Sequence, residues 1–301
     1  MDGIDKIAEY LALNTLVFHG RKFEDAFEIA AELGFKYVEP ACIENYYPDI
    51  IGDSFFSADN GRNFLAMATN VGLKVKSVGV HFNMGDHLKD ADAMIKRLDF
   101  AKEMGADIVI TNGAVRQNTK GFLECIEKVT PVLVDYGLVL ALENPGCGAA
   151  DSIIATGAAG ASLIDELANP HVRLNYDASN VYSYTKGSVL PEEDYLDAAP
   201  YCACLHLKQL KKDGDRWLFS ALGDGVTDYG IIIRGIRARY GTPYMSLELP
   251  VNHMRDQDLS ICKNTDFQVA PDSLIRDIVN DSVEYLASLV NFGVDTHALL
   301  S

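Results

Sequence analysis

The stretch LECIEKVTPVLVDYGLVLALENPG, residues 123–146, contains one complete copy of the pattern that decides the fold. Its first part is a helical stretch that ends at Gly137, and glycine just past a helix end takes the left-handed conformation that closes the helix. A short apolar run then ends in Glu143 and Asn144. A buried strand gains nothing from an acid at its last position, because an unpaired charge there loses its hydration. Glu143 therefore needs a functional explanation.

The same order of helix, glycine and strand recurs along the chain. Gly34, Gly72 and Gly105 each stand between a helical stretch and a β-rich run, as Gly137 does. The alternation continues beyond Gly137, where glycines mark the helix ends less regularly. With an opening strand near residues 10–18, the pattern predicts eight strands and eight helices. Strands that alternate with helices and read as apolar runs indicate a parallel sheet covered on both faces. Eight such units in 301 residues favour an α/β fold of the (β/α)₈ TIM barrel type over a doubly wound sheet.

The chain is expected to form one barrel domain over residues 1–301. No linker or low-complexity segment divides it, and two long loops are expected at about residues 40–60 and 250–271. Neither the GxGxxG nor the GxxxxGK[ST] phosphate-binding loop follows a strand, which removes the main nucleotide-binding alternative.

Charge and composition exclude several classes of partner. The chain has 43 acidic and 26 basic residues, a net charge of −17, and this acidity opposes binding to a nucleic acid backbone. No apolar run approaches the roughly 20 residues that span a bilayer. The acidic N-terminus shows no secretory signal, and the six cysteines form no CxxC pair. We expect a cytoplasmic protein that acts on a small molecule, with neither a nucleic acid nor a membrane partner. The sequence leaves open whether it acts as a monomer or as a homo-oligomer.

Polar side chains stand at the ends of the expected strands. In a barrel the catalytic groups lie at the carboxyl ends of the strands, so these residues meet at one mouth. In chain order the strand ends carry Glu39, His81, Asn112, Glu143 with Asn144, Asp177 with Asn180, His206 with Lys208, and Glu248.

Strands five to eight supply a candidate metal site. Carboxylates that converge repel one another, and a divalent cation removes that repulsion. The two glutamates, the aspartate and the histidine at the ends of these strands offer oxygen and nitrogen donors. Such donors are suited to Mn²⁺, Mg²⁺, Co²⁺ or Zn²⁺, with positions left for a substrate. Each residue alone is more often a strand-end ion pair or a core residue than a ligand, and their joint placement carries the prediction. The expected ligands are Glu143, Asp177, His206 and Glu248.

Other polar residues at the same mouth are expected to bind substrate. Lys208 lies two residues after His206 and so faces the same side of the strand, where a lysine is costly unless it meets anions. On the second long loop, His253 and Arg255 are candidates for binding a phosphate or a carboxylate, although solvated side chains are the simpler interpretation. The complete expected set is His81, Asn112, Asn180, Lys208, His253 and Arg255.

The first long loop carries four aromatic residues, Tyr46, Tyr47, Phe55 and Phe56. Long connections in a compact barrel are usually lids or pocket walls. The four rings could stack on the apolar face of a sugar, or they could pack against the barrel rim or a partner subunit.

The ordered segments LALENPG, VRLNYDASN, CLHLKQL, LGDGVTDYG and YMSLELP resemble the xylose-isomerase-like TIM barrel superfamily. This superfamily includes sugar and sugar-phosphate isomerases and epimerases, inosose dehydratase, and DNA repair enzymes of the endonuclease IV type (AP endonuclease family 2). The resemblance covers strands two to eight. It implies metal ligands at Glu143, Asp177, His206 and Glu248, and it implies that Glu143 and Glu248 also exchange protons with a substrate carbon, as in the epimerases.

The chain departs from the family pattern in ways that bear on metal number. Many members have a histidine three residues after the strand-six aspartate, where this chain has Asn180. Many have His-x-His on strand seven, where this chain has Cys204-Leu205-His206. The additional histidines of a three-metal cluster are not evident. The expected cofactor is therefore one divalent ion, with Mn²⁺ favoured.

Three functions are compatible with these residues. The leading one is a metal-dependent sugar or sugar-phosphate isomerase or epimerase, which removes a proton beside a metal-bound ketone. The second is a dehydratase of a keto-polyol on the same scaffold. The third is a non-catalytic sugar-binding or DNA-repair protein, and the net charge of −17 opposes the DNA-binding form of it.

Overall fold

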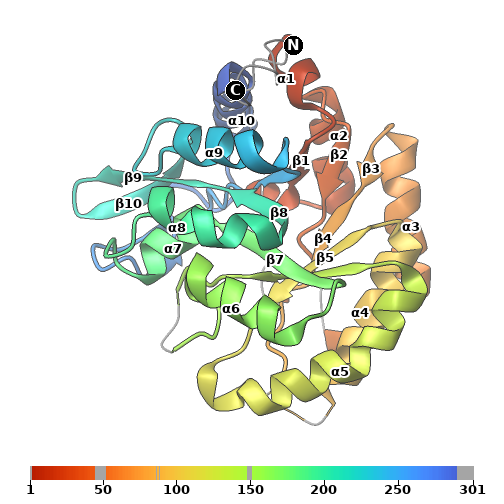
Figure 1. Ribbon diagram of the computed structural model, residues 1–301. Coiled ribbons are helices and arrows are strands. Elements are labelled where there is room, and N and C mark those ends of the chain that lie inside the picture. Colours follow the sequence, from red (N-terminus) through yellow and green to blue (C-terminus); the bar gives the residue numbers. More distant parts are fainter. Residues whose placement is uncertain (1, 45–51, 86, 88, 148–150, 290–301) are drawn as a thin grey trace, which may run out of the picture.

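The computed structural model describes residues 2–44, 52–85, 87, 89–147 and 151–289. Within them, a nine-stranded parallel sheet has the order β3-β2-β1-β11-β8-β7-β6-β5-β4 (Figure 1). Its strands are β1 Leu11–Asn14, β2 Tyr37–Glu39, β3 Lys74–Val75, β4 Ser77–Gly79, β5 Ile108–Asn112, β6 Val139–Glu143, β7 Val172–Asp177, β8 Cys202–Leu207 and β11 Met245–Leu247.

The sheet closes into a barrel between its two edges. Beyond the end of β2, Ala41 forms a parallel bridge with Gly79, and Cys42 donates a backbone hydrogen bond to the Gly79 carbonyl at 2.7 Å. β3 and β4 are two parts of one expected strand, separated by Lys76. The eight expected barrel strands are therefore present, and the (β/α)₈ prediction is confirmed.

The helices surround the barrel (Figure 1). Gly34, Gly72, Gly105 and Gly137 all have positive φ angles, as expected of glycines that close helices. The described helices are α1 Asp2–Ile7, α2 Phe23–Glu32, α3 Ala58–Asn70, α4 Asp90–Met104, α5 Thr119–Tyr136, α6 Gly157–Leu167, α7 Ala178–Tyr184, α8 Pro191–Ala198, α9 Tyr229–Tyr240 and α10 Asp272–Leu289. The short α7 follows directly on β7, and α1 packs against α10.

A second, antiparallel sheet was not predicted. It has the order β13-β12-β10-β9, where β9 is Gln209–Asp213, β10 is Arg216–Ser220, β12 is His253–Arg255 and β13 is Ile261–Lys263. β9 and β10 form a hairpin that extends away from the barrel in Figure 1. The segment expected as a long loop at about 250–271 therefore contains two strands, because its backbone pairs with the hairpin that follows β8.

The side chains inside the barrel change from apolar to polar toward one end. Strand residues alternate between the interior and the helices, so Ala141 and Glu143 of β6 both point inward. Ile108, Ile110, Ala141 and Cys204 form a small buried apolar cluster. The next inward residues along these strands are Asn112, Glu143 and His206. The polar residues at the carboxyl ends of the strands thus rest on an apolar floor.

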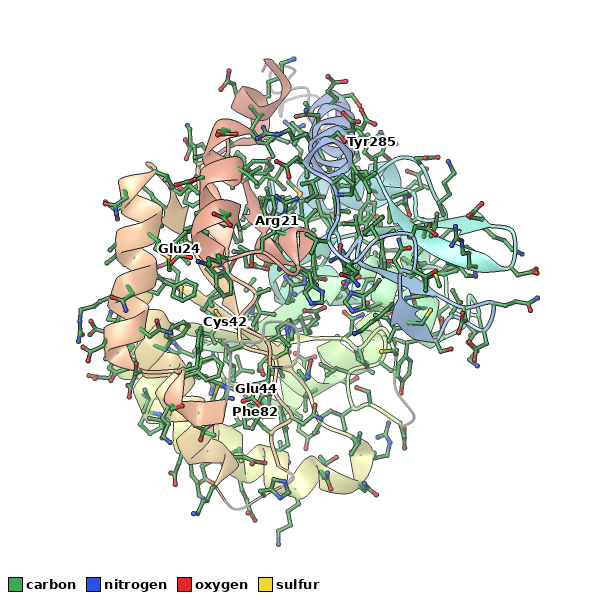
Figure 2. All side chains as sticks on the ribbon, turned by 180° about the vertical axis from the view of Figure 1, so that it is seen from behind. Arg21, Glu24, Cys42, Glu44, Phe82 and Tyr285 are labelled. Carbon is green, nitrogen blue, oxygen red and sulfur yellow. The ribbon has the colours of Figure 1, made fainter. Side chains whose placement is uncertain are left out.

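The loop after β2 is held against α4 by Arg97. This buried arginine lies 3.0 Å from Asp53 Oδ1 and 3.3 Å from Glu44 Oε1, and its guanidinium packs on the rings of Phe56 and Phe82. Glu44 and Phe82 accordingly lie close together in Figure 2.

Phe55 and Phe56 do not serve as a sugar platform in this structure. Both rings make edge-on or tilted contacts with Phe100, so packing against the barrel rim explains them. Tyr46 and Tyr47 lie outside the described residues.

Candidate metal centre and active site

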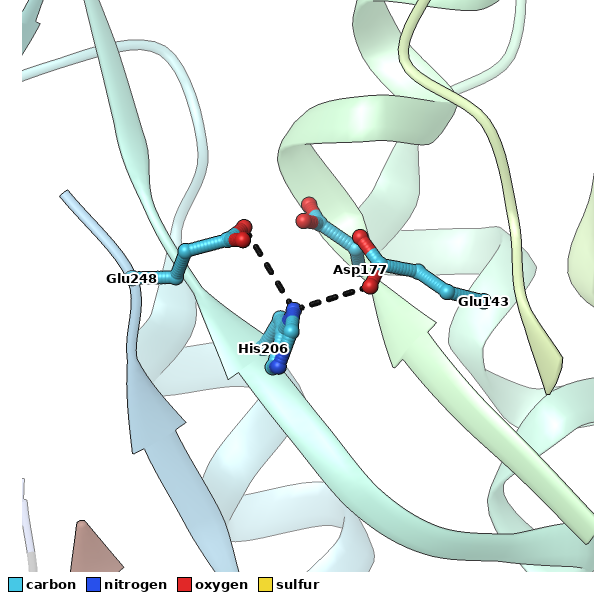
Figure 3. Close-up of side chains that lie close together, drawn as sticks. All are labelled: Glu143, Asp177, His206 and Glu248. Atoms are coloured by element: carbon cyan, nitrogen blue, oxygen red, sulfur yellow. Dashed lines mark ion pairs between the residues drawn. The ribbon is translucent and has the colours of Figure 1, made fainter. Parts of the chain in front are cut away.

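Four acidic and imidazole side chains meet at the mouth of the barrel. Glu143, Asp177, His206 and Glu248 are all buried, and one ligand atom from each lies within 4.8 Å of the others. Figure 3 shows the carboxylates of Glu143 and Glu248 approaching His206 from opposite sides, with Asp177 between them. The strands fix this arrangement: the backbone register pairs Asp177 with His206, and Glu248 continues the β11 ladder by donating to the Leu207 carbonyl at 2.9 Å.

Several donor atoms of this group are buried without a hydrogen-bond partner among the described residues. They are His206 Nδ1, Asp177 Oδ2 and Glu248 Oε2. Their close contacts are ion pairs within the centre: the two carboxylate oxygens contact Lys208, and His206 Nδ1 lies 3.0 Å from Glu143 Oε2. Buried polar atoms are normally hydrogen-bonded, and an exception needs an explanation. Three such atoms converging from three strands are explained by a cation that they would bind together. The residues present therefore fit the divalent ion that the sequence predicts.

Glu143 is the most tightly held of the carboxylates. Its Oε2 accepts from His81 Nε2 at 2.8 Å and from Asn175 Nδ2 at 3.1 Å, and its Oε1 accepts from Asn180 Nδ2 at 3.0 Å. Burial would raise the pKa of Glu143, but the neighbouring His206 and His81 outweigh it and hold that pKa well below its usual range. Glu143 is therefore ionised and fixed in direction.

Glu248 and Asp177 are held by a buried cation instead. Lys208 Nζ lies 2.8 Å from Asp177 Oδ2 and forms a closer ion pair with Glu248 Oε2. Burial would raise the pKa of Glu248, but Lys208 and His206 lower it to about 2. Burial raises the pKa of Asp177 to about 6, against the attraction of Lys208. Lys208 does face the same side as His206 and meets anions there, as the sequence predicted.

His206 is oriented by a carboxylate behind the centre. Its Nε2 lies 2.8 Å from Glu39 Oε1, and because an ionised carboxylate can only accept, Nε2 donates and Nδ1 faces the centre. Glu39 is itself fully buried and accepts from Asn14 Nδ2 at 2.6 Å and from the Ser77 hydroxyl. Histidines that bind metals usually donate their other ring N–H to such a group.

Sequence reasoning placed Glu39 at a strand end but gave it no role. The acid at the end of the second strand was the available signal. Its partner is on β8, which does not neighbour β2 in the sheet, so this contact could not be read from the chain.

A cavity of about 590 Å³ opens above the centre. This volume lies in the range of small-molecule sites. Glu143 and Glu248 form part of its wall. Five of the six residues expected to bind substrate also line it, namely His81, Asn112, Asn180, Lys208 and Arg255.

His253 is the exception among the expected substrate residues. Its ring stacks on His19 with 5.2 Å between ring centroids, and it is not part of the cavity wall. Burial, together with His19 and Lys263, lowers the pKa of His253 to about 4, so the ring is uncharged at neutral pH. A neutral imidazole in this position does not supply the expected charge for a phosphate or a carboxylate.

Solved structures share this fold at low sequence identity. D-psicose 3-epimerase, determined in the presence of D-fructose, superimposes with a TM-score of 0.70 at 12% identity, covering 93% of this chain and 99% of that chain. The IolI protein with a bound zinc atom gives 0.68 at 12%, covering 93% and 98%. The probable 3-DHS dehydratase AsbF from Bacillus anthracis gives 0.64 at 14%, covering 92% and 98%.

Two comparisons of sequence complete the assignment. No curated protein sequence matches the chain significantly. The family model for the xylose isomerase-like TIM barrel matches residues 27–267, which include all four candidate metal ligands. This protein therefore belongs to the xylose isomerase-like TIM barrel family.

Proposed function

We propose that this protein is a divalent-metal-dependent isomerase or epimerase of keto sugars or their phosphates. The observation that carries the proposal is the placement of Glu143 and Glu248, which approach one buried centre from opposite sides at the floor of a small-molecule cavity. A single ion would be held by these two glutamates with Asp177 and His206, and Mn²⁺ suits this set of oxygen and nitrogen donors. When bound, the ion would polarise a ketone oxygen of the substrate and so acidify the neighbouring C–H bond.

The side chains of this protein would perform the proton transfers. Glu248 is ionised at neutral pH and lines the cavity, so it can accept a proton from a substrate carbon. A positioned base of this kind contributes about 10²–10⁴-fold to the rate. Return of the proton to the neighbouring carbon would give an isomer, and delivery from the side of Glu143 and His81 would give an epimer. Lys208 holds Glu248 and Asp177 in place through the reaction.

A dehydratase acting on a keto-polyol is the second candidate, and the asymmetry of the two glutamates favours it. Both oxygens of Glu143 already accept hydrogen bonds, from His81, Asn175 and Asn180, whereas the carboxylate of Glu248 forms ion pairs with Lys208 and His206. One base is enough for loss of a β-hydroxyl, because the proton that Glu248 removes from carbon can be passed to the leaving hydroxyl, which departs as water. Epimerisation instead needs a proton acceptor on one face of the carbon and a proton donor on the other. AsbF, described as a probable dehydratase, has the same fold.

The proposal is tested by proton exchange in D₂O. The full chain is supplemented with Mn²⁺ and incubated with ketoses, keto-polyols and their phosphates, and NMR follows deuterium incorporation and products. Deuterium at the carbon next to the ketone, with a new sugar, supports isomerase or epimerase activity, and loss of water identifies the dehydratase. A protein that binds Mn²⁺ but exchanges no proton in any of these compounds would be a binding protein, and the enzymatic proposal would be wrong.

A further inference from the structure

A polar network fills one side of the barrel beneath the metal centre. Barrel interiors are normally packed with branched apolar side chains. Here Asn14 of β1, Glu39 of β2 and Ser77 of β4 are all fully buried. A buried carboxylate is costly unless hydrogen bonds satisfy it, and apolar residues of similar size often serve a fold as well or better. The network therefore needs an explanation other than stability.

The hydrogen bonds of this network all point toward Glu39. Its Oε1 accepts from Asn14 Nδ2 at 2.6 Å and from His206 Nε2 at 2.8 Å, and its Oε2 accepts from the Ser77 hydroxyl. Both carboxylate oxygens thus have donors, and the donors fix the direction in which Glu39 faces the ring of His206. The other nitrogen of that ring faces the metal centre.

Tyr244 extends the network to the opposite end of the barrel. It directly precedes β11, so it lies at the amino end of the strand that Glu248 follows. Its hydroxyl oxygen lies 3.1 Å from Ser77 Oγ. Because Ser77 has a single hydroxyl proton and donates it to Glu39, Tyr244 is the donor in this contact. Three successive hydrogen bonds therefore connect Tyr244 through Ser77 and Glu39 to His206.

The ring of Tyr244 is held in place, and its hydroxyl stays protonated. Lys76 Nζ lies 4.7 Å from the centre of the ring, and Tyr37 packs edge-on against it with 6.4 Å between ring centroids. Burial raises the pKa of Tyr244 well above its usual value, and the neighbouring Cys204 and Glu39 raise it further. The phenol is therefore a lasting donor, and successive hydrogen bonds in a protein interior polarise and strengthen one another.

We propose that Ser77 and Tyr244 are positioning residues of the metal centre, which hold Glu39 and so set the orientation of His206 and its affinity for a divalent ion. Neither residue is a candidate ligand, so both act through Glu39. The inference rests on the proposed function only in placing an ion at the four ligands, and not on the reaction. It extends the centre from the barrel mouth to a phenol at the opposite end.

The test measures Mn²⁺ binding to the full chain by calorimetry, together with the electron paramagnetic resonance spectrum of the bound ion. Tyr244→Phe removes only the phenol hydroxyl, and Ser77→Ala removes the donor to Glu39 itself. A hydrogen bond changes an equilibrium by a net factor of about 2–10, so Tyr244→Phe should weaken Mn²⁺ binding by about that factor. Ser77→Ala should weaken it at least as much. Both variants should alter the spectrum, because the geometry at His206 changes.

A double-mutant cycle shows whether the effect passes through Glu39. In a Glu39→Gln background, Tyr244→Phe should change the Mn²⁺ affinity and the spectrum little further, because the carboxylate through which it acts is already gone. Tyr37→Phe is the matched control. It also removes a phenol hydroxyl, from a ring that contacts Tyr244, but that hydroxyl interacts with the exposed Glu9. It should change neither the affinity nor the spectrum, and circular dichroism confirms that each variant is folded.

Unchanged Mn²⁺ affinity in both Tyr244→Phe and Ser77→Ala would overturn the proposal. So would an effect of Tyr244→Phe that persists in full in the Glu39→Gln background, or one that Tyr37→Phe reproduces. A chain that binds no Mn²⁺ would overturn the proposal together with the metal centre.

The fate of the proposed function is read separately. A loss of Mn²⁺ affinity that passes through Glu39, in a chain that exchanges no substrate proton, would leave the inference standing and remove the enzyme. Proton exchange by a chain whose Mn²⁺ affinity is indifferent to Tyr244→Phe and Ser77→Ala would do the reverse.

Discussion

At the scale of single residues, the two glutamates of the centre differ in what surrounds their oxygens. Glu143 accepts hydrogen bonds at both oxygens from three side chains, whereas Glu248 is held by ion pairs with Lys208 and His206. The sequence could place both at strand ends, since strand and helix alternate regularly. It could not distinguish them, because the side chains that donate to Glu143 come from the segment after β4, from β7 and from α7.

Replacing either glutamate by glutamine should reduce turnover by about 10²–10⁴-fold, since each change removes a ligand charge and a proton acceptor. Glu143→Gln should also weaken metal binding more than Glu248→Gln does. The amide introduced by Glu143→Gln would turn N–H groups toward His81, Asn175 or Asn180, which themselves donate there. Steady-state kinetics and metal titration measure the two effects. Glu124→Gln, on the outer surface of α5, is the control. Substantial activity in either variant at saturating metal would remove its assigned role.

Glu39 should act as a positioning residue for His206. Glu39→Gln keeps the size of the side chain but loses the charge that fixes the Nε2 proton, and loss of such partners typically weakens metal binding by about 10–100-fold. We expect this loss in a Mn²⁺ titration, with an altered Mn²⁺ electron paramagnetic resonance spectrum. Glu9→Gln, which removes an exposed ion pair with Lys36, should change neither the Mn²⁺ affinity nor the spectrum. Unchanged affinity and spectrum in Glu39→Gln would show that His206 needs no orienting carboxylate.

At the scale of elements, the barrel was predictable and the antiparallel sheet was missed. Helices closed by Gly34, Gly72, Gly105 and Gly137 signal strands that start nearby, and this local chemistry survives in the fold. The hairpin of β9 and β10 also carried a signal, because Gly214 and Asp215 form a two-residue turn of a common hairpin type. No signal in the sequence indicated that β10 pairs with β12, because those strands are brought together only by the closed barrel.

The loop after β6 should require glycine at position 146. A Cβ there would overlap Asn180 Oδ1, so Gly146→Ala must displace Asn180 or Arg255 from the cavity wall. We expect a clear loss of activity with a nearly unchanged melting temperature, because the strain falls on the site rather than on the core. Gly3→Ala is the matched control, since its added Cβ would meet its nearest neighbours at an ordinary 3.6 Å. Full activity in Gly146→Ala would mean that the loop adjusts freely.

At the scale of the whole molecule, an acidic chain also brings buried carboxylates together at the barrel mouth, where a cation would stabilise them. The chain carries a net charge of −17, and no described helix is long and apolar enough to cross a membrane. The cytoplasmic location and a homo-oligomeric state stay predictions. Within the described part of the chain, Lys208 and the imidazoles of His81 and His206 offset the buried carboxylates of the centre. A bound divalent ion would offset the charge of these carboxylates and would link the ends of β6, β7, β8 and β11.

Removal of the ion should therefore lower both activity and stability. Reconstitution after chelation should restore a stoichiometry near one per chain by elemental analysis, because Asn180 stands where a further histidine ligand would be needed. At a hundredfold excess over Kd, binding contributes about 2.7 kcal/mol to the folded state. A chain of this size should then melt about 5 °C higher. The same titration on Asp177→Asn, which keeps the side-chain volume, should show a smaller shift, since one ligand charge is lost. Glu9→Gln controls for general effects of charge. A protein whose activity and melting temperature are indifferent to chelation and to added Mn²⁺ would contradict the metal centre, and with it the proton-transfer chemistry that depends on a polarised ketone.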